Sequence, residues 1–161
     1  MFSVDDVVVY GKNGVCKVTQ VGTLNLPMID PGKQYYTMHP LYKKDAVLYA
    51  PVDNNKSVLR RVMSKEEAQS LLDEIPMLEG TWIVSEKDRE NQYKSALAAC
   101  DCRQLVKIIK ALQIRKQSRL QDGKKVTVVD ERYSRLAGDQ LFEELTYALG
   151  LTREEFDSFF Y

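Results

Sequence analysis

The sequence has few of the residues from which disulfides, metal centres and acid–base sites are built. Its 161 residues include three cysteines and one histidine. Cys16 lies far along the chain from Cys100 and Cys102, and no CxxC motif or Cys/His cluster is present. This pattern predicts a reduced, cytoplasmic protein without structural disulfides. His39 has no partners in the sequence that would form a zinc site or a catalytic triad, so we expect no metal.

Long apolar runs and catalytic motifs are also missing. No stretch of about 18 apolar residues is available for a transmembrane helix, and residues 1–6 lack the features of a secretory signal. Glycine-rich phosphate loops, HExxH and GxSxG do not occur. We therefore expect a non-enzymatic protein with no cofactor, no small-molecule substrate and no membrane partner. An enzyme that uses a carboxylate pair is the remote alternative.

The charges balance over the whole chain but not locally. The 23 basic and 23 acidic residues exclude a polybasic tail or a strongly acidic disordered chain. Residues 87–125, however, hold eleven basic and four acidic residues, a net charge of +7, between segments of net −2 and −5. Lysines and arginines that neutralise phosphates drive sequence-independent binding to DNA. A merely solvated helix face is an equally weighted alternative.

The first 63 residues predict strands. Five short segments are rich in β-branched and aromatic residues, and glycine- or proline-containing turns separate several of them. They cover 4–10, 15–21, 33–38, 46–52 and 57–62. So many short strands predict a small, strongly bent antiparallel sheet or barrel. An exposed edge of such a sheet can pair with a partner strand, and residues 47–49 and 21–26 are the candidates unless they pair internally.

The remaining residues predict helices, so the expected architecture is α+β with two domains, 1–63 and 64–161. Ser64 to Glu67 and Asp101 to Gln104 have capping-box patterns, and Ser85 is a third candidate cap. A long helix is expected over 127–149, with Leu136 among its inward residues. A short last helix should follow Thr152.

The basic stretch supplies the candidate DNA contacts. Its cations fall on two neighbouring predicted helices, and several would share one surface if those helices pack antiparallel. We assign DNA binding to Lys87, Arg89, Lys94, Arg103, Lys107 and Lys110. Trp82, the only tryptophan, is a candidate wedge between bases. Burial of this ring in the core or at a hinge is the favoured alternative.

The order of these segments resembles a known family. Residues 2–10, 14–18 and 50–53 resemble the opening domain of the CarD/CdnL family of bacterial transcription regulators. That domain is also similar to the RNA polymerase-interacting module of the transcription-repair coupling factor. Tyr93-Lys94 and residues 101–105 resemble the helical C-terminal domain of the family. The resemblance extends to about residue 150.

The resemblance implies a Tudor-like N-terminal sheet that binds the β1 lobe of the RNA polymerase β subunit. The positions of the family's polymerase contacts fall near Leu24 and Tyr49, and we add Val47 and Leu48 beside the latter. The helical domain is expected to contact promoter DNA at the upstream edge of the transcription bubble, through phosphates and the minor groove. Together the two domains would stabilise the open complex.

Two positions in the helical domain carry over individually from the family. Lys94 matches a phosphate contact, whereas Arg89 stands where well-known members have a wedge tryptophan. Arginine also enters a narrowed minor groove, because the negative potential there favours it. The main alternative is a protein-only adaptor that binds polymerase while its basic face does not touch DNA. The latter protein would show a weak salt dependence of DNA binding.

Overall fold

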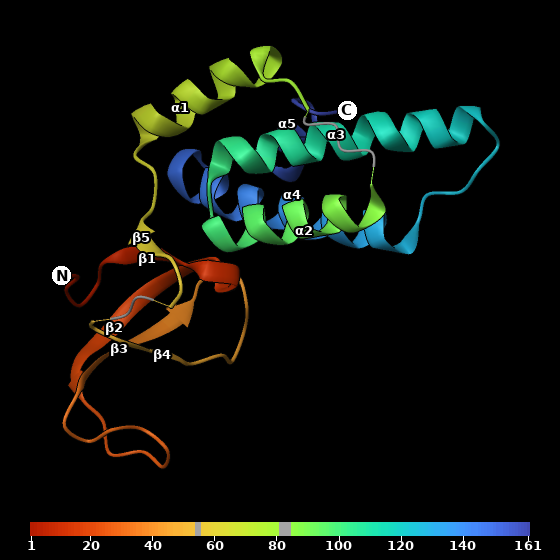
Figure 1. Cartoon of the computed structure of the whole chain (residues 1–161). Coiled ribbons are helices and arrows are strands. Elements are labelled where there is room, and N and C mark those ends of the chain that lie inside the picture. The colour runs from red at the N-terminus through yellow and green to blue at the C-terminus, as the bar shows by residue number, and fades with distance from the viewer. Residues whose placement is uncertain (54–55, 81–84) are drawn as a thin grey trace. The chain divides into compact units, whose positions relative to one another are not determined.

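The computed structural model describes residues 1–53, 56–80 and 85–161. Within these residues the chain divides into two compact units, Met1–Val62 and Met63–Tyr161. We call them the sheet unit and the helical unit. Figure 1 shows strands in the first and helices in the second, which confirms the predicted α+β architecture.

The sheet unit is a five-stranded antiparallel sheet in the order β4-β3-β2-β1-β5. A 3-10 turn, Gly11–Asn13, joins β1 to β2, and Gly11 and Gly14 both have positive φ there. The ladder between β2 and β3 shifts register between Val18 and Gln20, and a bulge of this kind bends a strand. The strand bounds are Val7–Tyr10 (β1), Val15–Thr23 (β2), Gln34–Pro40 (β3), Leu48–Pro51 (β4) and Leu59–Arg61 (β5).

One face of the sheet carries the core of this unit. Alternate residues of β3 point to it, as the period of two in a strand requires. The buried cluster consists of Val8, Cys16, Val18, Tyr36, Met38 and Ala50. Tyr35 and Thr37, on the opposite face of β3, are buried as well. Strand β3 is therefore covered on both faces.

The two predicted sheet edges differ in outcome. Residues 48–51 form β4, which lies at the edge of the sheet. Val21 and Thr23, in contrast, pair with Tyr36 and Gln34 of β3. Residues 21–23 therefore pair inside the sheet with β3, because β2 and β3 both extend beyond the shorter strands beside them.

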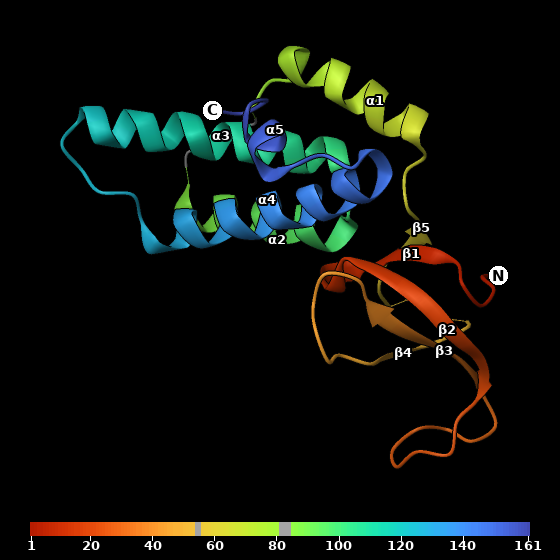
Figure 2. The same cartoon turned by 180° about the vertical axis from the view of Figure 1, so that it is seen from behind.

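The helical unit contains α1 (Lys65–Glu74), α2 (Glu86–Ala99), α3 (Cys102–Gln121), α4 (Val128–Leu149) and α5 (Arg153–Asp157). Helices α2, α3 and α4 pack side by side, and α1 packs on α4 (Figure 1, and from behind in Figure 2). A 3-10 segment, Ile75–Met77, follows α1 and contains Pro76. No helix within the described ranges is long and apolar enough to cross a membrane.

The helix starts follow the predicted caps with one difference. Ser64 and Glu67 form a complete capping box, and Asp101 accepts hydrogen bonds from the N–H groups of Arg103 and Gln104. Ser85 occupies the N-cap position of α2, but its side chain makes no capping hydrogen bond. Its neighbouring N–H groups therefore lack the side-chain partner that the sequence predicted.

The core of the helical unit is larger than that of the sheet unit. Helix α4 contributes a stripe with a four-residue spacing that includes Tyr133, Ala137, Leu141 and Leu145, all buried. Leu136 was expected to point inward but is exposed. Because successive helix residues are rotated by about 100°, a residue adjacent to the stripe turns away from it.

Gly80 marks a close approach between the segment after α1 and helix α3. A Cβ atom at this position would lie 2.8 Å from the backbone N of Ala111 and 3.0 Å from its Cα. Backbone atoms cannot move aside as a flexible side chain can. Glycine is therefore required for this contact.

Candidate protein and nucleic-acid interfaces

The edge strand β4 directs part of its backbone away from the sheet. The N–H of Val52 donates to the carbonyl of Gln34 at 3.0 Å, and Ala50 lies opposite Tyr36 in the same ladder. Hydrogen-bonded and non-hydrogen-bonded pairs alternate along an antiparallel ladder. The N–H and C=O of Tyr49 therefore point outward. Pro51 also points outward but has no N–H, so Tyr49 supplies the outward donor of β4.

The predicted polymerase contacts lie in two places. The side chains of Val47 and Tyr49 are exposed at the β4 edge, whereas Leu48 packs against the core. Leu24 follows the last residue of β2, which pairs with Gln34. The structure thus brings Val47, Leu48 and Tyr49 together, and it separates Leu24 from them by the width of β3.

Comparison with protein families decides what the sheet unit is. Residues 2–63 match the family model of the CarD-like/TRCF RID domain. The N-terminal part of the chain is a CarD-like RNA polymerase-interacting domain. The protein is therefore related to transcription. No curated protein matched the chain, and the family match ends where the helical unit begins.

Two of the predicted DNA contacts lie together on helix α2. Lys87 and Lys94 are both exposed and stand seven residues apart, which places them on the same side of the helix. The ammonium of Lys94 is 3.6 Å from Oε1 of Glu90. Arg132 of α4 reaches the same oxygen at 3.5 Å. Sequence reasoning missed Arg132, because it lies outside the basic stretch 87–125.

The predicted contacts on α3 face the segment that contains α1. Arg103 donates to Glu74 through Nε at 2.7 Å and through Nη2 at 2.8 Å, and this pairing lowers the pKa of Glu74. The ammonium of Lys110 donates to the carbonyls of Ile75 and Leu78. Lys107 lies between these two cations in sequence and is half-buried. The structure therefore assigns Arg103 and Lys110 contacts that hold α1 and the following turn on α3.

The structure describes one of the two wedge candidates. Trp82 lies outside the described residues. The Arg89 side chain is only 12% exposed, and its Nη2 is 3.7 Å from Oε1 of Glu86. Arg89 therefore lines a cavity inside the helical unit, instead of projecting from its surface.

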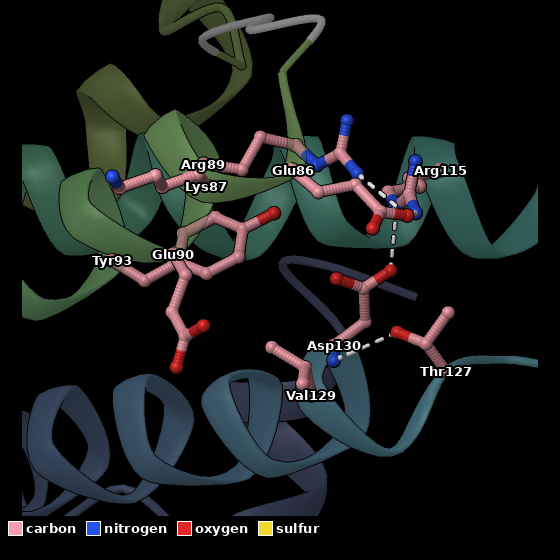
Figure 3. A pocket seen from close by; sticks show the side chains of 9 residues that line it. All are labelled: Glu86, Lys87, Arg89, Glu90, Tyr93, Arg115, Thr127, Val129 and Asp130. Atoms are coloured by element: carbon pink, nitrogen blue, oxygen red, sulfur yellow. Dashed lines mark hydrogen bonds and ion pairs between the residues drawn. The ribbon is translucent and has the colours of Figure 1, made fainter.

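Helices α2, α3 and α4 enclose this cavity, which has a volume of about 350 Å³. Figure 3 shows how charged side chains from all three helices face one another there. Nε of Arg115 is 2.5 Å from Oδ2 of Asp130, and both side chains are mostly buried. The lining residues are Glu86, Lys87, Arg89, Glu90, Tyr93, Arg115, Thr127, Val129 and Asp130.

Tyr93 lies at the centre of these charges. Burial is the main cause that raises its pKa, and the carboxylate of Asp130 adds to the rise. Arg89 and Arg115 oppose it, since a cation nearby favours the phenolate. Within the described residues no group of three histidine, cysteine or acidic side chains is placed to hold a metal. The cavity is thus lined mainly by arginine, lysine and carboxylate side chains.

Proposed function

We propose that this CarD-like protein binds the β subunit of RNA polymerase, at its β1 lobe, by adding a partner strand to β4. The observation that carries the proposal is the outward N–H and C=O of Tyr49 on an edge strand of the matched domain. Such backbone pairing supplies affinity, and neighbouring side chains supply specificity. Val47 and Tyr49 would be those side chains, with Leu24 at the rim.

We further propose that helix α2 contacts promoter DNA at the upstream edge of the bubble. Lys87 and Lys94 would lie on backbone phosphates, and Arg132 would add its charge beside Lys94. Contacts of this kind position a protein on DNA and read little sequence. Tighter binding to melted than to closed promoter would then stabilise the open complex. A preference of about 1–3 kcal/mol shifts that population about five- to 150-fold.

The proposed activity is regulatory, takes place in the bacterial cytoplasm and uses no catalysis by the protein itself. The alternative is an adaptor that binds polymerase alone. The ion pairs of Lys94 and Arg132 with Glu90 support this alternative, because they neutralise part of the cationic surface.

The polymerase contact is tested with the full chain and a β1-lobe fragment of the β subunit. Tyr49→Pro removes the outward N–H and should weaken binding at least tenfold. Tyr49→Val keeps the N–H and serves as the matched control for the lost side chain. Equal loss in both variants would show that the ring, and not strand pairing, holds the partner. Undiminished binding of both would refute the β4 interface.

The DNA contact is tested by the lifetime of open complexes formed with polymerase on a promoter. Lys94→Glu should shorten this lifetime, whereas Lys65→Glu, an exposed charge reversal on α1, should not. Replacing Lys94 with Gln should reduce the salt slope of DNA binding by about one. Polymerase binding with no effect of either Lys94 variant would establish the adaptor.

A further inference from the structure

Two arginines from different helices converge on one exposed carboxylate at the mouth of the cavity. Nη2 of Arg89 and Nη2 of Arg115 lie 3.7 Å and 4.0 Å from the same Oε1 of Glu86. The two arginine side chains are 12% and 14% exposed, whereas that of Glu86 is 83% exposed. Both distances exceed that of a hydrogen bond. The exposed Glu86 carboxylate therefore approaches the two guanidinium groups only loosely (Figure 3).

Arg115 is held in place from behind. Its Nε faces Oδ2 of Asp130 at 2.5 Å, and the Asp130 side chain is 8% exposed. Asp130 lies in the first turn of α4, where its N–H donates to Oγ1 of Thr127 at 3.1 Å. This support leaves Nη2 directed toward Glu86. A ligand that met this nitrogen would find it already ordered, which lowers the entropic cost of binding.

The other carboxylates of the cavity are engaged more firmly than Glu86. Asp130 accepts from Arg115, and Oε1 of Glu90 accepts from the Tyr133 hydroxyl at 3.2 Å. Glu90 is also surrounded by the Lys94 and Arg132 cations. Glu86 is thus the carboxylate that can turn into solvent with the fewest contacts broken. Its departure would leave Nη2 of Arg115, whose charge Asp130 balances from behind, and the Arg89 guanidinium, which is also hydrogen-bonded to Tyr93, at the opening.

The N-terminus of α2 reinforces the positive potential at the same opening. Glu86 is the first residue of this 14-residue helix, and the Ser85 side chain makes no capping hydrogen bond. The first-turn N–H groups of a helix carry a partial positive charge. Lys87 adds a full charge beside them.

We propose that the cavity is an oxyanion site in which a phosphate group replaces the Glu86 carboxylate between Arg89 and Arg115. Arginine pairs suit this ligand, because their planar groups donate two parallel hydrogen bonds to phosphate oxygens. The volume of about 350 Å³ admits a phosphate and its substituent. The phosphate group belongs either to a free phosphorylated molecule or to the DNA backbone, and in the second case the inference rests on the proposed function. Glu86 acts as the built-in competitor.

The test measures binding of inorganic phosphate and pyrophosphate to the full chain by calorimetry, with the Tyr93 ring signals in NMR as a local readout. Glu86→Gln removes the competitor and should raise affinity about two- to fivefold, the worth of an exposed ion pair. Glu131→Gln, an exposed glutamate in the first turn of α4, is the matched control and should change nothing. Arg115→Lys keeps the charge but loses the planar group, and it should lower affinity about tenfold.

The outcome for Glu86→Gln keeps the test valid even if Arg115→Lys fails to fold, because the Glu86 side chain is exposed. No binding to the wild type or to Glu86→Gln at millimolar phosphate would overturn the site. Equal affinities of Glu86→Gln and Glu131→Gln would do the same. Competition between pyrophosphate and a short duplex would assign the phosphate to DNA, whereas independent binding would assign it to a free ligand. Open-complex lifetimes with Lys94→Glu separate a failure of the DNA proposal from a failure of this site.

Discussion

The sheet unit and the helical unit present different chemistry to their surroundings. In the sheet unit the buried core cluster is apolar, and the edge strand β4 offers uncharged backbone groups. In the helical unit two carboxylates, Asp130 and Glu144, are buried. Asp130 is paired with Arg115, and Glu144 accepts from the N–H of Met63 and from the thiol of Cys102.

This difference leads us to expect that salt acts differently on the contacts proposed for the two units. Strand pairing depends on directional backbone hydrogen bonds, so its affinity should respond weakly to ionic strength. Phosphate contacts release counterions, so their affinity should fall steeply with salt. If both proposed contacts form, one chain would combine a salt-tolerant protein contact with a salt-sensitive contact to phosphate.

The largest expected effect concerns the buried charges of the helical unit. Arg115→Ala leaves Asp130 as an unpaired buried carboxylate and should lower the free energy of unfolding by about 3–5 kcal/mol. Urea unfolding followed by circular dichroism of the helices measures it. Lys116→Ala, at the exposed neighbouring position, should stay within about 0.5 kcal/mol of wild type. A loss below about 1 kcal/mol for Arg115→Ala would show that water reaches Asp130 and solvates it.

The next effect concerns the apolar core of the sheet unit. Met38 is fully buried, and Met38→Ala should destabilise this unit by about 2–5 kcal/mol through the cavity it leaves. Binding of the polymerase fragment should weaken accordingly, while phosphate binding by the helical unit persists. His39→Ala, at the exposed next position of β3, is the control. If Met38→Ala lost both binding activities, the two units would depend on each other for folding. The contrast drawn between them would then be wrong.

The smallest effect is a dependence on pH in the helical unit. Arg103 holds the pKa of Glu74 below its ordinary value of 4.5. A carboxylate with a depressed folded-state pKa stabilises the protein above the unfolded value, and this contribution is lost as the pH falls through the folded value. Stability should therefore decline below about pH 4.5, and Glu74→Gln should remove that part of the decline. Thermal unfolding between pH 3 and 7 measures it, with Glu66→Gln as control; identical profiles for both variants would contradict the assignment.

Much of the fold follows from local sequence. The Ser64 capping box and the Asp101 cap were predictable, because a cap involves side chains and N–H groups only two or three residues apart. The apolar face of α3 followed from its spacing in the same way. The five strands were also predicted, with ends that differ by a few residues. The sequence offered residues 47–49 as one of two candidate edges, and only the strand order places β4 at the edge.

Contacts between distant parts of the chain were decided by the tertiary structure. Nothing in the local pattern pairs Arg115 with Asp130 or directs Lys110 to the carbonyls after α1. The same holds for Arg89, whose spacing suits an exposed helix face but whose side chain lines a cavity. Periodicity reports which residues share a face of one element, and it carries no information about which element packs on that face. The sequence by itself determined the helices, the strands and the basic stretch, whereas packing decided which cations stay exposed and which become paired.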